Sequence, residues 1–194
     1  MARPGGGRMD YRVAGRHKEE SRMSVGDRVK ECIDKMGIGD FENALIQLSI
    51  AFDGTARREY PAMKVGERFM TFLRDNQDII TYFTFAGNRF IDCTFDGHKL
   101  EDIIYRVLRC GLIHEASIPD EIEFVDEVVL SHAGGRWRFP KAYVEGGLLA
   151  IVGARSNAAE RVPDHYVVVV KGQTHRVNDL WGRNDEIRRI MSGD

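Results

Sequence analysis

Residues 40–60 read DFENALIQLSIAFDGTARREY and carry the strongest helical pattern of the chain. Asp40 is a typical N-cap residue, and Pro61, which follows the segment directly, prevents the helix from continuing. Apolar residues recur in between at steps of three and four, which gathers them on one face of a helix. This face consists of Phe41, Ala44, Leu45, Leu48, Ala51, Phe52 and Thr55. The stretch therefore predicts a helix that packs into a helical core.

Two isoleucines of this helix lie nearly opposite its main apolar face. Ile46 and Ile50 cannot face the same neighbours as Leu45 and Leu48, because successive helical residues are about 100° apart. A helix that is apolar on two sides is either central in its own fold or shared with a partner subunit. We expect a mixture of both, and therefore a homodimer.

The same spacing predicts further helices along the chain. They span residues 25–36, 64–75, 100 to about 116 and 141–154, with a last helix capped by Asn178 that places Leu180, Ile187 and Met191 on one side.

Extended segments are expected between these helices. Residues 79–97, rich in aromatic and β-branched side chains, predict a short hairpin or extended excursion. Residues 121–130 and 136–139 predict two strands joined by a glycine turn, in which alternation puts Arg136 and Arg138 on one face. Residues 165–170 and 174–177 predict a hairpin. The expected fold class is mainly α, a helical bundle with β-hairpins added in the C-terminal third.

The domain organisation follows from composition along the chain. Residues 1–24 combine a glycine run with a surplus of basic residues, and predict a mobile basic tail. Residues 25–194 predict a single domain, made of a helical bundle over 25–118 and a mixed α/β extension over 119–194.

Overall composition excludes several classes of protein. The 194 residues are 43% hydrophobic and 30% charged, with a formal net charge of −2, which argues against disorder throughout and against a strongly basic nucleic-acid binder. No apolar run approaches the ~20 residues of a membrane span, so we expect no membrane association. The 3 cysteines form no metal-like or disulfide-like spacing. We expect no metal, no cofactor and a cytoplasmic location.

One motif carries chemistry. Residues 105–115 read YRVLRCGLIHE, in which four residues separate Arg109 from His114 on a late helix. This arrangement resembles the HEPN (higher eukaryote and prokaryote nucleotide-binding) family, whose mark is an Arg followed after four to six residues by a His. The resemblance covers at most residues 25–118. It implies a helical bundle that dimerises, and in many members a metal-independent endoribonuclease of a defence or toxin-type system.

The resemblance also implies roles for individual side chains. His114 would act as general acid or base toward a ribose 2′-hydroxyl, and Arg109 would bind the phosphate and stabilise its developing charge. Glu115 could orient His114, while Tyr105 and Arg106 could contact an RNA substrate.

Three other interpretations stay open. In a regular helix Arg109 and His114 point about 140° apart, which suits a histidine at the edge of the core and a solvated arginine. The helices could instead form a non-catalytic dimerisation or interaction module. A small ligand could also bind in a pocket between the helical part and the C-terminal hairpins.

Overall fold

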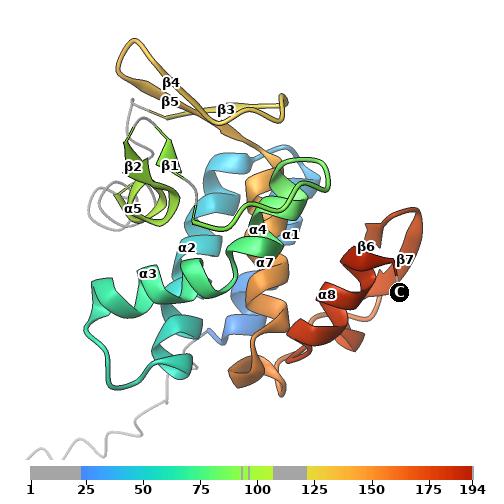
Figure 1. The fold of residues 1–194 in the computed structure, drawn as a ribbon. Helices are drawn as coiled ribbons and strands as arrows, with labels where there is room; N and C mark the ends of the chain where they lie inside the picture. The colour runs from blue at the N-terminus through green and yellow to red at the C-terminus, as the bar shows by residue number, and fades with distance from the viewer. Residues whose placement is uncertain (1–22, 93, 96, 107–121, 194) are drawn as a thin grey trace, which may run out of the picture.

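The computed structural model describes residues 23–92, 94–95, 97–106 and 122–193, which form a mostly helical fold with small β-sheets (Figure 1). The α-helices are α1 (Val25–Gly37), α2 (Phe41–Glu59), α3 (Val65–Asp75), α4 (Gln77–Thr84), α5 (Leu100–Tyr105), α7 (Ala142–Gly153) and α8 (Asn184–Ser192). The 3-10 helices are η2 (Arg155–Asn157) and η3 (Val177–Asp179). The strands are β1 (Thr94–Phe95), β2 (His98–Lys99), β3 (Ile122–Val125), β4 (Ser131–Ala133), β5 (Arg136–Pro140), β6 (Val167–Val170) and β7 (Gln173–Arg176).

Helices α1 and α2 begin where their capping residues predict. Ser24 and Asp27 form a reciprocal capping box at the start of α1, and Asp40 accepts a hydrogen bond from the Asn43 backbone at the start of α2. The turn between the helices is made at Gly39, with a φ of 78°, two residues after the expected stop at Gly37. Both predicted helices are thus confirmed.

The predicted inner face of α2 is buried. Ala44, Leu48 and Phe52 are each 0% exposed, and Phe41 alone of the predicted face is only partly buried. On the opposite side, Ile46 packs against the same core and Ile50 is 37% exposed. One of the two residues of the second apolar side is therefore used within the chain, and the other is exposed. Helix α3 likewise follows its predicted span.

Helix α7 lies at the centre of the helical layer, between α2 and α4 (Figure 1). All of its residues are buried except Ala142 and Glu145. Two glycines permit this close packing. A Cβ on Gly146 would lie 2.5 Å from the carbonyl oxygen of Ile80, and one on Gly147 would lie 2.9 Å from a Leu48 methyl group. The glycines that weaken this helix in isolation are thus what lets it pack.

The prediction of extended structure over residues 79–97 is wrong for its first part. Residues 77–84 form helix α4, which packs along α7. The hydroxyls of Thr81 and Thr84 donate to carbonyls one turn earlier, each at 2.7 Å, so these buried side chains are satisfied inside a helix. Tertiary packing overrides the local β propensity here. Among the described residues at the end of this segment and just after it, the two-residue strands β1 and β2 form an antiparallel pair.

The β3–β5 sheet covers one end of the helices (Figure 1). Gly134 and Gly135, both with positive φ, make the predicted glycine turn, but this turn joins β4 to β5. The prediction that it joins residues 121–130 to residues 136–139 is wrong, because residues 131–133 form a strand and, of residues 122–130, only 122–125 do. Strand β3 pairs with β5 in parallel. The predicted alternation holds on β5, where Phe139 is 3% exposed and Arg138 turns toward Glu123.

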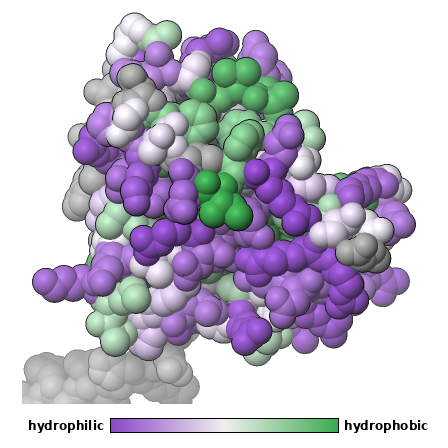
Figure 2. Space-filling model, in the orientation of Figure 1, coloured by the Kyte–Doolittle hydropathy of each residue, from purple (hydrophilic) through white to green (hydrophobic). Residues whose placement is uncertain are grey.

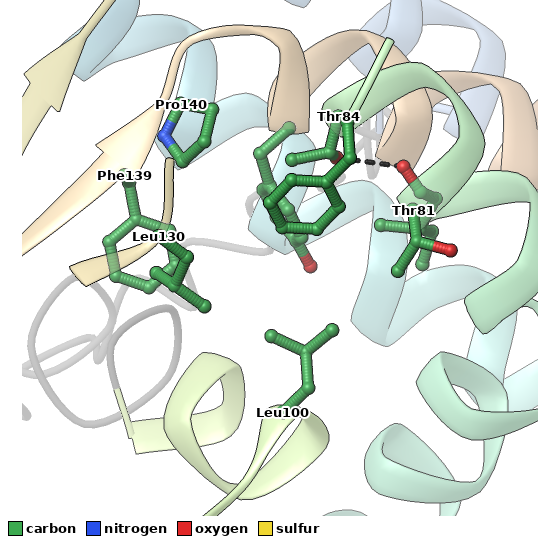
Figure 3. A pocket seen from close by; sticks show the side chains of 9 residues that line it. Thr81, Thr84, Leu100, Leu130, Phe139 and Pro140 are labelled. Carbon is green, nitrogen blue, oxygen red and sulfur yellow. Dashed lines mark hydrogen bonds between the residues drawn. The ribbon is translucent and has the colours of Figure 1, made fainter. Parts of the chain in front are cut away.

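Figure 3 shows where this sheet meets the helices. Leu130 and Phe139 on the sheet side face Leu100 of α5 and Thr84 of α4 around a cavity of about 10 Å³. This space holds at most about one water molecule, so it is a packing gap rather than a ligand site.

The C-terminal elements include one confirmed hairpin and one misplaced helix start. Strands β6 and β7 pair as predicted around Lys171 and Gly172, whose positive φ values of 50° and 77° make the turn. Asn178 does not cap the last helix. It exchanges hydrogen bonds with the Val162 backbone at 3.0 and 2.8 Å, and α8 begins only at Asn184.

No helix in the described part of the chain has both the length and the apolar character needed to cross a bilayer.

Candidate functional site: a groove beside strand β6

Of the candidate residues in the sequence motif, the structure describes Tyr105 and Arg106. Tyr105 ends α5, and its ring meets Phe69 of α3 edge-on, with 5.7 Å between the ring centroids. Arg106 is exposed. Arg109, His114 and Glu115 lie outside the described residues, as does the predicted helix beyond residue 106. Packing against α3 gives Tyr105 a structural role.

A different feature stands out in the described residues, a cavity of about 320 Å³ between α1, α7 and β6. This volume lies in the range of about 300–1,000 Å³ that is usual for ligand sites. The cavity lies between the helical part of the chain and a C-terminal hairpin. We call it the β6 groove, and its lining residues are Val29, Ile33, Met36, Phe83, Glu145, Leu148, Leu149, Val152, Val167, Val168, Val169 and Val177.

The helical wall of the groove comes from two regular stripes. On α1, Val29, Ile33 and Met36 follow one another at steps of four and three, and therefore share a face. On α7, Leu148 and Val152 are one turn apart and continue the same apolar surface. This wall belongs to the core cluster of the protein, so it is rigid.

The opposite wall is the edge of strand β6. Val167, Val168 and Val169 all border the groove, although their side chains alternate between the two faces of the hairpin. We infer from this lining that the edge of the strand, rather than one of its faces, borders the cavity. Val167 and Val169 are 51% and 62% exposed, which agrees with an open edge.

The register of the hairpin determines which backbone groups point into the groove. The two-residue turn makes Val170 and Gln173 a hydrogen-bonded pair, and the Val177 N–H donates to the Tyr166 carbonyl at 3.1 Å. Hydrogen-bonded pairs alternate with non-bonded ones in an antiparallel ladder, so Val167 and Val169 direct their N–H and C=O groups away from β7. No hydrogen bond to these groups occurs within the described part of the chain. The groove thus contains an unpaired strand edge.

One anchor fixes the base of the hairpin to the helices. The Tyr166 hydroxyl donates a hydrogen bond to Asp34 of α1, and Lys30 donates to the same carboxylate at 2.6 Å. The hydrogen bond from Lys30, followed by that from Tyr166, lowers the pKa of Asp34 below its ordinary value. The same Asp34 contact raises the pKa of the Tyr166 phenol. This anchor sets the distance between the two walls.

Glu145 is the one titratable side chain among the residues that line the groove. It is exposed toward the cavity, and its apolar surroundings raise the pKa of its carboxyl by desolvation. An apolar cavity with a single perturbed carboxylate is the usual form of a binding site.

On the face shown in Figure 2, hydrophobic side chains form separate patches within a mainly hydrophilic surface.

A second cavity, of about 300 Å³, lies between the end of α2, the α3–α4 junction and the start of α8. Several of its polar groups bind one another, although the buried Asn184 Oδ1 has no hydrogen-bond partner among the described residues. The Tyr60 hydroxyl donates to Asp75 at 2.6 Å, and Arg188 donates to Asp78 at 2.8 Å. Burial, and then the Asp75 contact, raises the pKa of Tyr60. We therefore interpret this cleft as a polar junction that holds the helices together.

Among the residues that the structure describes, no group of three or more His, Cys, Asp or Glu side chains could hold a metal ion. The groove offers apolar contacts, backbone hydrogen bonds and one carboxylate.

Sequence reasoning missed these groove residues, although two signals were present. Glu145 is the lone charged residue in an otherwise apolar helix, AYVEGGLLAIVG. Residues 167–170 are four successive valines without any charge, which is unusual for an exposed strand edge.

Comparison with known proteins identifies relatives along most of the chain. The uncharacterized protein Rv1289 of Mycobacterium tuberculosis is 28% identical over 188 residues, covering 89% of this chain and 90% of the relative. The uncharacterized protein Mb1320 of Mycobacterium bovis gives the same values of 28%, 89% and 90%. No solved structure shows significant similarity. Residues 24–194 match the Rv1289 family, to which the chain therefore belongs.

Proposed function

We propose that the protein is a non-catalytic interaction module that binds an extended peptide segment in the β6 groove. The observation that supports this function is the edge of β6 that does not pair with β7, which borders an apolar cavity and is accessible to solvent. An added strand would form hydrogen bonds with the backbone groups of Val167 and Val169. Its apolar side chains would fill the space against α1 and α7.

The chemistry of the groove favours a peptide over a compact apolar molecule. A peptide supplies N–H and C=O groups at the spacing of a strand, so it satisfies the groups that β6 presents. Each backbone hydrogen bond contributes about 0.5–1.5 kcal/mol, and each buried aliphatic side chain about 1.5–3 kcal/mol. Ordering the peptide offsets part of this gain, so we expect moderate affinity.

Proline substitution tests the strand edge directly. Val169→Pro removes the outward N–H while leaving the ladder with β7 intact, because edge positions tolerate proline when the lost N–H does not bond. Val169→Ala is the matched control, since it shortens the same side chain and keeps the N–H. The probe is a set of labelled hexapeptides rich in valine, isoleucine and threonine, with binding measured by fluorescence anisotropy.

We expect Val169→Pro to weaken binding at least tenfold relative to Val169→Ala, with both variants folded by circular dichroism. In the free protein, amide exchange should be fast at Val167 and Val169 and slow at Val168, and peptide should protect the first two. Equal binding by the proline and alanine variants would refute the strand-addition model. Failure of every hexapeptide to bind the unaltered protein would refute the function itself.

A further inference from the structure

Glu145 has no partner of its own in the described structure. Neither an ion pair nor a hydrogen bond to its carboxylate occurs among the described residues. The residue one turn earlier, Lys141, is oriented elsewhere: its ammonium lies 2.8 Å from Asp126 and over the ring of Phe41, 5.1 Å from the centroid. The charge of Glu145 is therefore left uncompensated at the wall of the groove.

The surroundings of Glu145 make this charge unfavourable in the empty protein. The next residues along the face of α7, Leu148 and Leu149, are apolar, and so is the facing strand. Desolvation of a carboxylate without a partner disfavours its ionised form. A cation bound in the groove would stabilise the ionised carboxylate of Glu145, and a neutral group would not.

The position of Glu145 in the first turn of α7 offers a purely structural explanation. A glutamate there interacts favourably with the helix dipole, wherever its side chain points. Glu67 occupies the equivalent first turn of α3, is exposed, and does not line the groove. It provides a comparison in which the dipole interaction is present and the groove is absent.

On the basis of the proposed peptide groove, we propose that Glu145 makes it selective for segments that carry a lysine or arginine side chain facing α7. Charge complementarity supplies the selectivity: the uncompensated carboxylate lines the same cavity as the unpaired edge of β6. The backbone contacts bind any extended apolar segment, and Glu145 distinguishes basic segments from neutral ones.

The experiment compares three matched hexapeptides, whose central position is lysine, norleucine or glutamate. Norleucine keeps the aliphatic stem of lysine and removes its charge. Binding is measured by isothermal titration calorimetry at low and moderate salt for the unaltered full-length protein and for the variants Glu145→Gln and Glu67→Gln. Thermal unfolding of each variant is recorded in parallel.

For the unaltered protein and Glu67→Gln, we expect the lysine peptide to bind about tenfold more tightly than the norleucine peptide, and the glutamate peptide more weakly than both. In Glu145→Gln this preference should disappear, while affinity for the norleucine peptide is retained. Loss of the preference in Glu67→Gln, or its persistence in Glu145→Gln, would overturn the assignment.

Two further outcomes distinguish the role proposed for Glu145 from the proposed peptide-binding function. If the three peptides bind the unaltered protein equally, the role of Glu145 is refuted and the peptide groove stands. If no peptide binds, both are refuted together.

Discussion

Adding one methyl group at Gly146 tests how closely α7 packs on α4. In Gly146→Ala the new Cβ would lie 2.5 Å from the carbonyl oxygen of Ile80 and 3.0 Å from its Cα, and both are backbone atoms that cannot rotate away. The two helices must separate by roughly 1 Å before the contact becomes ordinary. Overpacking of this kind costs about 1–3 kcal/mol, of which the better helix propensity of alanine returns up to about 1 kcal/mol.

Gly37→Ala is the matched control. Gly37 is also helical, has no positive φ, and has nothing within 4 Å of the position of a new Cβ. The control gains the propensity of alanine without a steric penalty and should be stabilised by about 0.4–1 kcal/mol.

The difference between the two variants isolates the steric effect. We expect Gly146→Ala to unfold in urea with about 1–3 kcal/mol less stability than Gly37→Ala, at an unchanged m value. Its Tm should be lower by about 2–4 °C for each kcal/mol. Since Glu145 precedes Gly146, peptide binding should weaken as well. A Gly146→Ala protein as stable as the control would refute the close helix contact on which this reasoning depends.

Other predictions concern burial, pH, the sequence motif and assembly. Tyr143→Phe should keep or raise stability, by about 1 kcal/mol at most, in urea unfolding, because the buried Tyr143 hydroxyl has no hydrogen-bond partner in the described part of the chain. Lys30 first, and then Tyr166, lowers the pKa of Asp34, so these contacts stabilise the fold at neutral pH and lose this effect as the pH falls below the ordinary carboxyl pKa of about 4. Stability measured from pH 7 to pH 3 should therefore decline less in Asp34→Asn. If the ribonuclease hypothesis is right, His114→Ala or Arg109→Ala should slow RNA cleavage about 10²- to 10⁴-fold in gel assays, chelator should have no effect and DNA should stay intact; uncut RNA with the unaltered protein would contradict it. Sedimentation at high micromolar concentration should show the predicted homodimer, and a monomer there would exclude it.

Helix α2 was predicted correctly because its main apolar face and its end signals agree. Asp40 and Pro61 delimit this helix, and Gly37, the expected stop of the preceding helix, is the last residue of α1. Local chemistry of this kind acts over a few residues and can be recognised without knowledge of the fold. The prediction of the β6–β7 hairpin was confirmed for the same reason, because Lys171-Gly172 specifies its turn.

Failures arose where distant residues decide the structure. Residues 79–84 look extended locally, yet they form α4 because α7, some 60 residues later, presents glycines that admit a helix. Asn178 looks like a cap, but Val162 supplies its hydrogen-bond partners. A pocket between the helical part and the C-terminal hairpins was among the sequence interpretations, but its lining residues could not be predicted, since α1, α7 and β6 come from three separate parts of the sequence.

The helical wall beside β6 also has a protective effect. Four successive valines with an unpaired edge would be a template on which further strands assemble into aggregates, because nothing in their side chains repels another chain. Because α1 and α7 lie across the cavity from that edge, they limit the space in which further strands could add. The helices that form one wall of the β6 groove thus also hinder aggregation through the edge of β6.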